Sequence, residues 1–180
     1  MKTLESNKTK NGNRNLKAVG YELTVDVTPE KAWEVLTMFG NIGEYHTEIT
    51  KSRPLNGSSL EASLGTEREC TIGEGKNPIL LSERIIKYKE LDYFQYKAFD
   101  AKGFPATDFY NTFGIKRDNE GMTVIFVKTD FRLKPAILTH LMAGKLRKND
   151  RLVLLSYKHF METGEKKTDV KTLKRKYKDF

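Results

Sequence analysis

The feature that most constrains the fold is a run of short apolar segments in the middle of the chain, from about residue 50 to residue 131. Turn signals such as Gly73 and Gly121 separate these segments, and no helical pattern lies between them. Successive strands without intervening helices predict an antiparallel meander. The expected strands are residues 66–72, 79–88, 93–99, 107–116 and 123–131, with a further one near 48–55.

Regular patterns also flank this meander. Residues 17–27 alternate apolar and polar side chains, which predicts a half-buried strand. Thr28 and Pro29 then form a helix start, and Gly40 offers its stop; a second short helix is expected over 42–46. After the meander, Pro135 opens a pattern of apolar residues at spacings of three and four that runs to about residue 163. It predicts one helix, roughly 43 Å long at 1.5 Å per residue.

These elements predict an α+β fold. An antiparallel sheet of this length must curl, and its apolar face needs a cover. The last helix is the only predicted element large enough to provide that cover. We therefore expect a curved antiparallel sheet wrapped around a long C-terminal helix, with two short helices after the first strand and space for a small ligand in between.

The formal charge of +8 on the 180 residues is concentrated at the two ends of the chain. Residues 1–16 carry +3 and residues 145–180 carry +7, which leaves −2 for the stretch between them. The chain is expected to divide into a polar N-terminal tail (1–15), one domain (16–164) and a basic C-terminal tail (165–180). A solvated tail is the main interpretation, with contact to nucleic acid or an anionic membrane as the alternative.

Two further properties bear on the cellular setting. The N-terminus has no apolar run typical of a signal peptide, and no stretch approaches the roughly 20 apolar residues of a membrane helix. Cys70 is the only cysteine, so an internal disulfide and a cysteine-based zinc cluster are excluded. These properties predict a cytoplasmic protein, and Cys70 is interpreted as a small buried hydrophobe.

Several short segments carry a family resemblance. They are 25–33 (VDVTPEKAW), 39–46 (FGNIGEYH), 65–69 (GTERE), 82–85 (SERI), 103–105 (GFP) and 131–135 (FRLKP). Together they resemble the START-like (SRPBCC) superfamily of polyketide cyclases, dehydrases and lipid-transport proteins, over about residues 17–164. The resemblance implies a helix-grip fold with a cavity for an apolar ligand. Members of the superfamily bind lipids, sterols, polyketides or plant hormones, or act as cyclases.

Strand faces suggest which polar side chains enter such a cavity. Asn111 shares its face with Phe109, Phe113 and Ile115, the most apolar face of its strand, so its amide should point inward. Tyr96 lies in the same way beside Phe94. A buried amide or phenol must be hydrogen-bonded to protein, water or a ligand, and the pattern alone leaves these alternatives open.

The strand over 79–88 leaves two orientations open, because neither the face of Glu83 nor the face of Arg84 is cleanly apolar. The resemblance places this pair in the middle of a cavity-lining strand. Glu83, paired with Arg68, is taken as the inward residue. The alternative is a surface ion pair between strands, which contributes less than about 1 kcal/mol.

Tyr45 and His46 follow the second short helix, where the resemblance implies the lip of the cavity. The three histidines, at positions 46, 140 and 159, have no metal-ligand spacing, so neither a metal nor another cofactor is predicted.

The predicted function is binding of a small hydrophobic ligand between the sheet and the last helix. The predicted ligand-binding residues are Tyr45, Arg68, Glu83, Phe94, Tyr96, Asn111, Phe113, Leu138 and Met142. The alternative is an enzyme of cyclase or dehydratase type, in which Glu83 or His46 transfers protons and Arg68 stabilises negative charge. The sequence does not indicate an oligomeric state.

Overall fold

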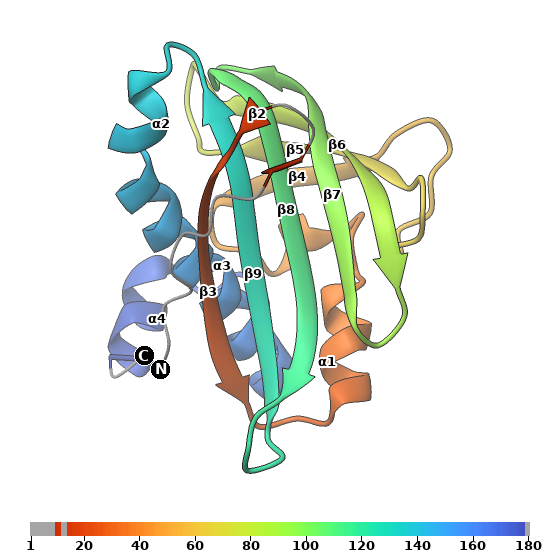
Figure 1. Ribbon diagram of the computed structural model, residues 1–180. Helices are drawn as coiled ribbons and strands as arrows, with labels where there is room; N and C mark the ends of the chain where they lie inside the picture. The colour runs from red at the N-terminus through yellow and green to blue at the C-terminus, as the bar shows by residue number, and fades with distance from the viewer. Residues whose placement is uncertain (1–9, 12–13, 179–180) are drawn as a thin grey trace.

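One curved antiparallel sheet of seven strands organises the chain (Figure 1), in the order β3-β9-β8-β7-β6-β5-β4. The computed structural model describes residues 10–11 and 14–178. The strands of the sheet are β3 (Lys17–Val25), β4 (Ile49–Pro54), β5 (Glu67–Ile72), β6 (Ile79–Lys89), β7 (Tyr93–Lys102), β8 (Ala106–Arg117) and β9 (Thr123–Leu133). The predicted α+β class and the antiparallel meander are confirmed.

Most of the expected N-terminal tail, 1–15, lies outside the described residues. Its described part forms a separate two-stranded ribbon of β1 (Lys10–Asn11) and β2 (Arg14–Asn15).

Two short helices follow the first long strand, as expected. Helix α1 (Pro29–Leu36) begins at Thr28, whose hydroxyl accepts a hydrogen bond from the Lys31 amide at 3.3 Å. The 3₁₀ helix η1 covers Ile42–Glu44. The capping hydroxyl and Pro29 at the first helical position are the local reason that the chain turns from strand to helix here.

The single long helix predicted from Pro135 is divided in the structure. Helix α2 (Ile137–Leu141) and helix α3 (Ala143–Thr163) meet at Met142. Gly144 lies in the first turn of α3. Glycine has a low helix propensity, so it disfavours a single helix that runs without a break from α2 into α3. Gly164, with φ of 72°, ends α3 at the predicted position.

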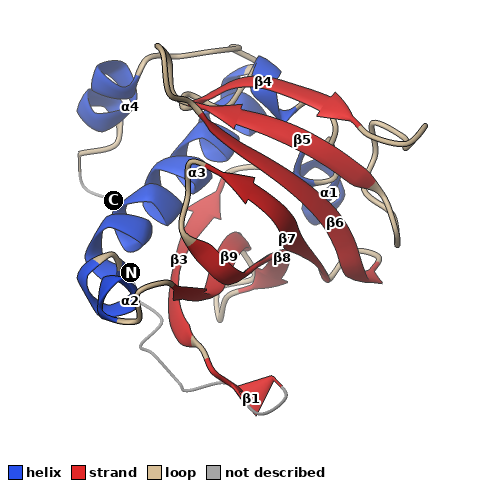
Figure 2. Ribbon diagram, turned by 90° about the horizontal axis from the view of Figure 1, so that it is seen from above, coloured by secondary structure: helices blue, strands red, loops and turns tan. Residues whose placement is uncertain are grey.

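Helix α3 lies across the concave face of the sheet, and the sheet curls around it (Figure 2). Its C-terminal half is buried on nearly all sides, and Leu154 and Leu155 are fully buried there. Its N-terminal half instead exposes Lys145, Arg147 and Lys148. The helix therefore fills one end of the concave face with core side chains and covers the other end only partly.

A fourth helix, α4 (Val170–Lys176), packs beside α3. Asp169 caps it by accepting hydrogen bonds from the amides of Lys171 and Thr172. Leu173 is fully buried and Tyr177 is 5% exposed, so this segment does not form the expected solvated tail. The apolar spacing of Leu173 and Tyr177 covers only one helical turn, too short to stand out as a periodic pattern among the lysines.

Gly114 on β8 lies in close contact with strand β9 and with the turn before β7. This contact gives a test of the fold. A Cβ atom at Gly114 would meet the Asp92 carbonyl oxygen and lie 2.5 Å from Phe126 Cζ. We expect Gly114→Ala to lower the free energy of unfolding by about 1–3 kcal/mol in urea titrations, because backbone and the half-buried Phe126 ring must move.

Gly144→Ala is the matched control, because a Cβ atom at Gly144 meets nothing within 4 Å. This change should raise the free energy of unfolding by about 0.5–1 kcal/mol, since alanine is the better helix former. Equal stabilities of the two variants would contradict the packing described at Gly114.

Candidate functional site

Two adjoining cavities lie between the concave face of the sheet and the N-terminal half of α3. The inner cavity has a volume of about 80 Å³, and the outer, more open one has a volume of about 810 Å³. The residues that line both are Glu48, Ile72, Leu81, Phe109, Leu146 and Asn149. Since these residues border both spaces, the two cavities are direct neighbours.

The outer cavity has apolar walls and a basic rim. Ile72, Phe104 and Phe109 contribute apolar surface. The charged residues that line it are Glu48, Glu74, Lys145, Lys148, Arg151 and Lys174, so cations outnumber anions four to two. Its volume lies within the range of roughly 300–1,000 Å³ that is typical of small-molecule sites.

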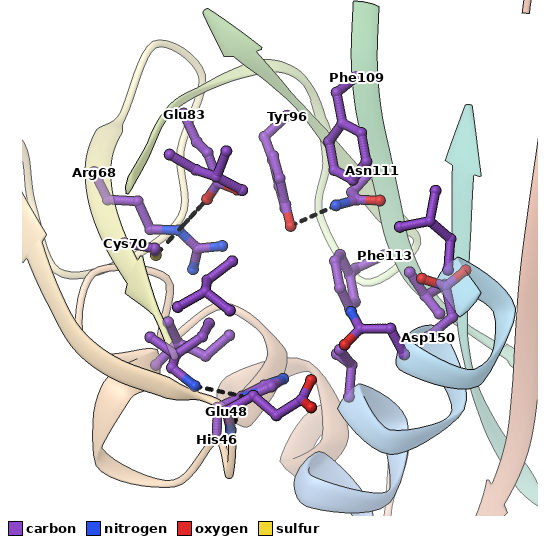
Figure 3. Close-up of a pocket in the computed structure, with 18 residues that line it drawn as sticks. His46, Glu48, Arg68, Cys70, Glu83, Tyr96, Phe109, Asn111, Phe113 and Asp150 are labelled. Atoms are coloured by element: carbon purple, nitrogen blue, oxygen red, sulfur yellow. Dashed lines mark hydrogen bonds and ion pairs between the residues drawn. The ribbon is translucent and has the colours of Figure 1, made fainter. Parts of the chain in front are cut away.

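Arg68 and Glu83 form a buried ion pair on the wall of the inner cavity (Figure 3). Arg68 Nε donates to Glu83 Oε2 at 2.6 Å, and the two side chains are only 2% and 3% exposed. Arg68 Nη1 donates to the Phe39 carbonyl oxygen at 2.7 Å, and the guanidinium lies 3.8 Å from the centre of the Phe39 ring. Removing two charges from water is costly, and this geometry offsets the cost by pairing and hydrogen-bonding them.

Glu83 points inward because regular alternation along β6 places it on the same face as the buried Leu81 and Ile85. The pairing of β6 with β5 is continuous through Glu83, whose partner in the register is Arg68. Arg84 then points outward, with 55% of its side chain exposed, and pairs with Glu67. The sequence left the orientation of this strand ambiguous because its inward face carries the charged Glu83, whereas its outward face carries the apolar Leu80 and Ile86.

Burial also sets the protonation of the groups beside this pair. Burial raises the pKa of Glu83, and the charge of Arg68 opposes that shift. Burial raises the pKa of the Cys70 thiol to about 11, so Cys70 is a neutral thiol near pH 7. The 2.6 Å ion pair, rather than the pKa, commits Glu83 to Arg68.

A chain of hydrogen bonds runs along the opposite wall of the inner cavity. Asn111 Nδ2 donates to Tyr96 Oη at 2.8 Å. Thr129 Oγ1 lies 2.6 Å from Asn111 Oδ1 and 2.9 Å from Asp150 Oδ1. A hydroxyl has one proton and can donate it to only one of these two oxygens. When Thr129 donates to Asn111, Asp150 must itself be protonated and donate to Thr129.

Asp150 is suited to carry that proton. It projects from α3, is 5% exposed, and burial raises its pKa from 3.8 to about 7, although the bond with Thr129 opposes the shift. Its second oxygen, Oδ2, has no hydrogen-bond partner. Asp150 therefore presents to the cavity a carboxyl group that changes charge near neutral pH.

His46 closes the floor of the inner cavity, where the close-up of Figure 3 places it below Arg68. Its Nδ1 accepts hydrogen bonds from the amides of Glu48 and Ile49 at 3.0 and 3.3 Å, so its proton must be on Nε2. Burial, together with the charge of Arg68, lowers the pKa of His46 to about 3. His46 is thus a neutral hydrogen-bond donor near pH 7, which does not suit the proton-transfer role that the enzyme alternative gives it.

The structure brings most of the sequence-predicted site residues to these cavities. Those that line the inner cavity are Arg68, Glu83, Tyr96, Asn111 and Phe113. Met142 lines the outer cavity. Whether they contact a ligand remains a prediction.

Three predicted site residues line neither cavity. Tyr45 was expected at the cavity mouth, but it is 2% exposed and its ring stacks on Phe160 at 4.8 Å. It packs against α3, and the next residue, His46, lines the inner cavity instead. Phe94 packs in the aromatic core against Phe39, and Leu138 packs against a second apolar cluster that includes Phe109 and Leu146.

Sequence reasoning missed Asp150 and Glu48 as cavity residues. A signal for Asp150 was present, because Leu146, Asp150 and Val153 are spaced by four and three and share one helix face. Among the residues that the structure describes, no three His, Cys, Asp or Glu side chains are grouped so as to hold a metal ion. No helix of the described chain is long and apolar enough to cross a membrane.

The raised pKa of Asp150 predicts a stability that falls as the pH rises. The unfolded chain releases this proton near pH 3.8 and the folded protein near pH 7, so the folded state binds more protons in between. Relative to Asp150→Asn, the wild type should lose up to about 1.4 kcal/mol of unfolding free energy per pH unit over that interval. Urea unfolding at pH 5, 6, 7 and 8 measures the difference.

Asp100→Asn controls for the loss of one acidic group, since Asp100 is exposed on β7. The free energy of unfolding of Asp100→Asn should change with pH in the same way as that of the wild type. A difference between wild type and Asp150→Asn that stays constant from pH 5 to 7 would show that Asp150 ionises normally in the folded protein.

Comparisons with known proteins agree with this architecture. Ara h 8.0201 is 16% identical, with a TM-score of 0.66 over 82% of this chain and 98% of that chain. XoxI from Bacillus cereus is 16% identical, with a TM-score of 0.62 over 80% and 94%. A protein from Thermus thermophilus is 11% identical, with a TM-score of 0.63 over 80% and 96%. At these identities the likeness concerns the fold alone.

The sequence itself matches one family. No curated protein matches the chain significantly. The model of a family described as polyketide cyclase / dehydrase and lipid transport matches residues 18–151. This match covers most of the chain and confirms the START-like resemblance and the helix-grip fold. The chain therefore belongs to the polyketide cyclase / dehydrase and lipid transport family.

Proposed function

We propose that this protein binds a small hydrophobic molecule in the two adjoining cavities between the sheet and α3. The observation that carries the proposal is the outer cavity of about 810 Å³, which continues inward past Leu81, Phe109 and Leu146. Apolar walls of this extent favour an apolar ligand, because its transfer from water gains about 25 cal/mol for each Å² buried. The family description, which includes lipid transport, supports the same class of ligand.

A second candidate is an enzyme that transfers a proton to or from such a ligand. Asp150 favours it, because a cavity-lining carboxyl group with a pKa of about 7 suits general acid–base catalysis. Glu83 and His46, the sequence-based candidates, are less suited because Glu83 is paired with Arg68 and His46 is neutral. If this candidate holds, the co-purified ligand should take up deuterium when it is incubated in D₂O with wild type, and should not do so with Asp150→Leu.

Blocking the passage between the cavities tests the binding proposal. Leu146 lines both cavities, and Leu146→Trp would fill the space between them. Native mass spectrometry of protein purified from its own host should show a bound small molecule on the wild type. In Leu146→Trp we expect at least a tenfold lower occupancy, because the indole takes the volume of the ligand.

Ile137→Trp provides the control, since Ile137 is 61% exposed on α2 and lines neither cavity. It should retain full occupancy, and circular dichroism should show that both variants stay folded. Full occupancy in a folded Leu146→Trp variant, or no bound molecule and no binding of apolar compounds by the wild type, would contradict the proposed function.

A further inference from the structure

Two buried polar atoms without partners belong to the same inner cavity. Among the described residues, the buried side-chain atoms without a hydrogen-bond partner are His46 Nε2, Gln95 Oε1, Asp150 Oδ2 and Thr168 Oγ1. His46 and Asp150 line the inner cavity, whereas Gln95 and Thr168 line neither cavity. Figure 3 shows His46 and Asp150 reaching this space from different elements, the loop after η1 and helix α3.

The hydrogen-bonding character of each atom follows from its neighbours. His46 Nδ1 already accepts two backbone amides, so Nε2 carries the proton and is a donor. Asp150 Oδ1 is engaged with Thr129, so Oδ2 remains as an acceptor. His46 and Asp150 thus contribute one unpartnered donor and one unpartnered acceptor, from side chains that are 3% and 5% exposed.

The charges around the inner cavity disfavour an anionic ligand group. Arg68 is the only arginine or lysine among the residues that line it, and it is paired with Glu83 and with the Phe39 carbonyl oxygen. Glu48 and Asp150 are further acidic groups that line the same cavity. A carboxylate or phosphate would find no uncommitted cation here and would approach acidic oxygens.

We propose that the inner cavity binds the neutral, hydroxyl-bearing end of an apolar ligand, whose O–H donates to Asp150 Oδ2, while a second ligand oxygen or an ordered water accepts from His46 Nε2. This inference rests on the proposed function and names the chemistry of the ligand's inner end. A ligand hydroxyl gives Asp150 Oδ2 a partner, whereas an alkyl end would leave it unpaired. Ordered water meets the same need in a ligand-free cavity, and the ligand hydroxyl replaces it.

Two substitutions of Asp150 separate the acceptor from the rest of the side chain. Asp150→Asn keeps an oxygen for the cavity, while its amide nitrogen donates to Thr129 in place of the protonated carboxyl. Asp150→Leu removes the acceptor and still lets Thr129 donate to Asn111, which lies 2.6 Å away. Thr168→Val is the control, since it removes an unpartnered buried hydroxyl outside both cavities.

The experiment compares 1-decanol with decane as competitors of 1-aminoanthracene bound to each protein at pH 6. We expect wild type, Asp150→Asn and Thr168→Val to bind 1-decanol about tenfold more tightly than decane, the effect expected of pairing a buried polar group. In Asp150→Leu this preference should fall below about twofold, with decane binding unchanged or stronger.

Equal affinities of 1-decanol and decane for the wild type, or an unchanged preference in Asp150→Leu, would overturn the inference. Either result would leave the proposed function standing, because both compounds would still bind. Absence of binding by both compounds and by 1-aminoanthracene would instead reject the proposed function, and this inference with it.

Discussion

A seven-stranded curved sheet with one long helix on its concave face is the constraint on which the rest of this structure depends. A curled sheet presents more apolar surface than one helix covers, so the helix must leave part of it open or be supplemented by other elements. Here α1 and α4 supplement the C-terminal half of α3, where Leu154, Leu155 and Tyr157 are buried. The N-terminal half lacks such support, and the cavities lie there.

The polar residues on the cavity wall depend on the same arrangement. Arg68, Glu83 and Asp150 are nine-tenths or more buried, although each would be better solvated at the surface. Burying such groups costs stability unless they are paired. Arg68 and Glu83 are paired with each other, whereas Asp150 and His46 each retain one unpartnered atom. Natural proteins commonly retain groups that lower stability where function requires them. The unpartnered atoms of Asp150 and His46 are therefore consistent with a binding site for a partly polar ligand.

The sequence predicts what depends on regular periodicity and local capping. The alternation that turns Asn111 and Tyr96 inward is intact, and the Thr28–Pro29 start of α1 is a local signal. Other features depend on irregularities or on tertiary contacts. The inward position of Glu83 depends on its ion pair with Arg68 across two strands, and the packing of Tyr45 against Phe160 leaves His46 at the cavity. The cavity volume depends on how much of the sheet α3 covers. That cover results from tertiary packing, which no local sequence pattern predicts.

The most direct test of the central claim is to locate a bound ligand by methyl NMR spectroscopy. Titration of 1-decanol into protein with labelled Ile, Leu and Val methyl groups should shift signals of Ile72, Leu81 and Leu146, which line both cavities. Methyl signals of Leu154 and Leu173, which are fully buried and line neither cavity, should stay in place. Shifts confined to exposed residues such as Leu64 and Leu141, or no shifts at saturating ligand, would contradict a binding site between the sheet and α3.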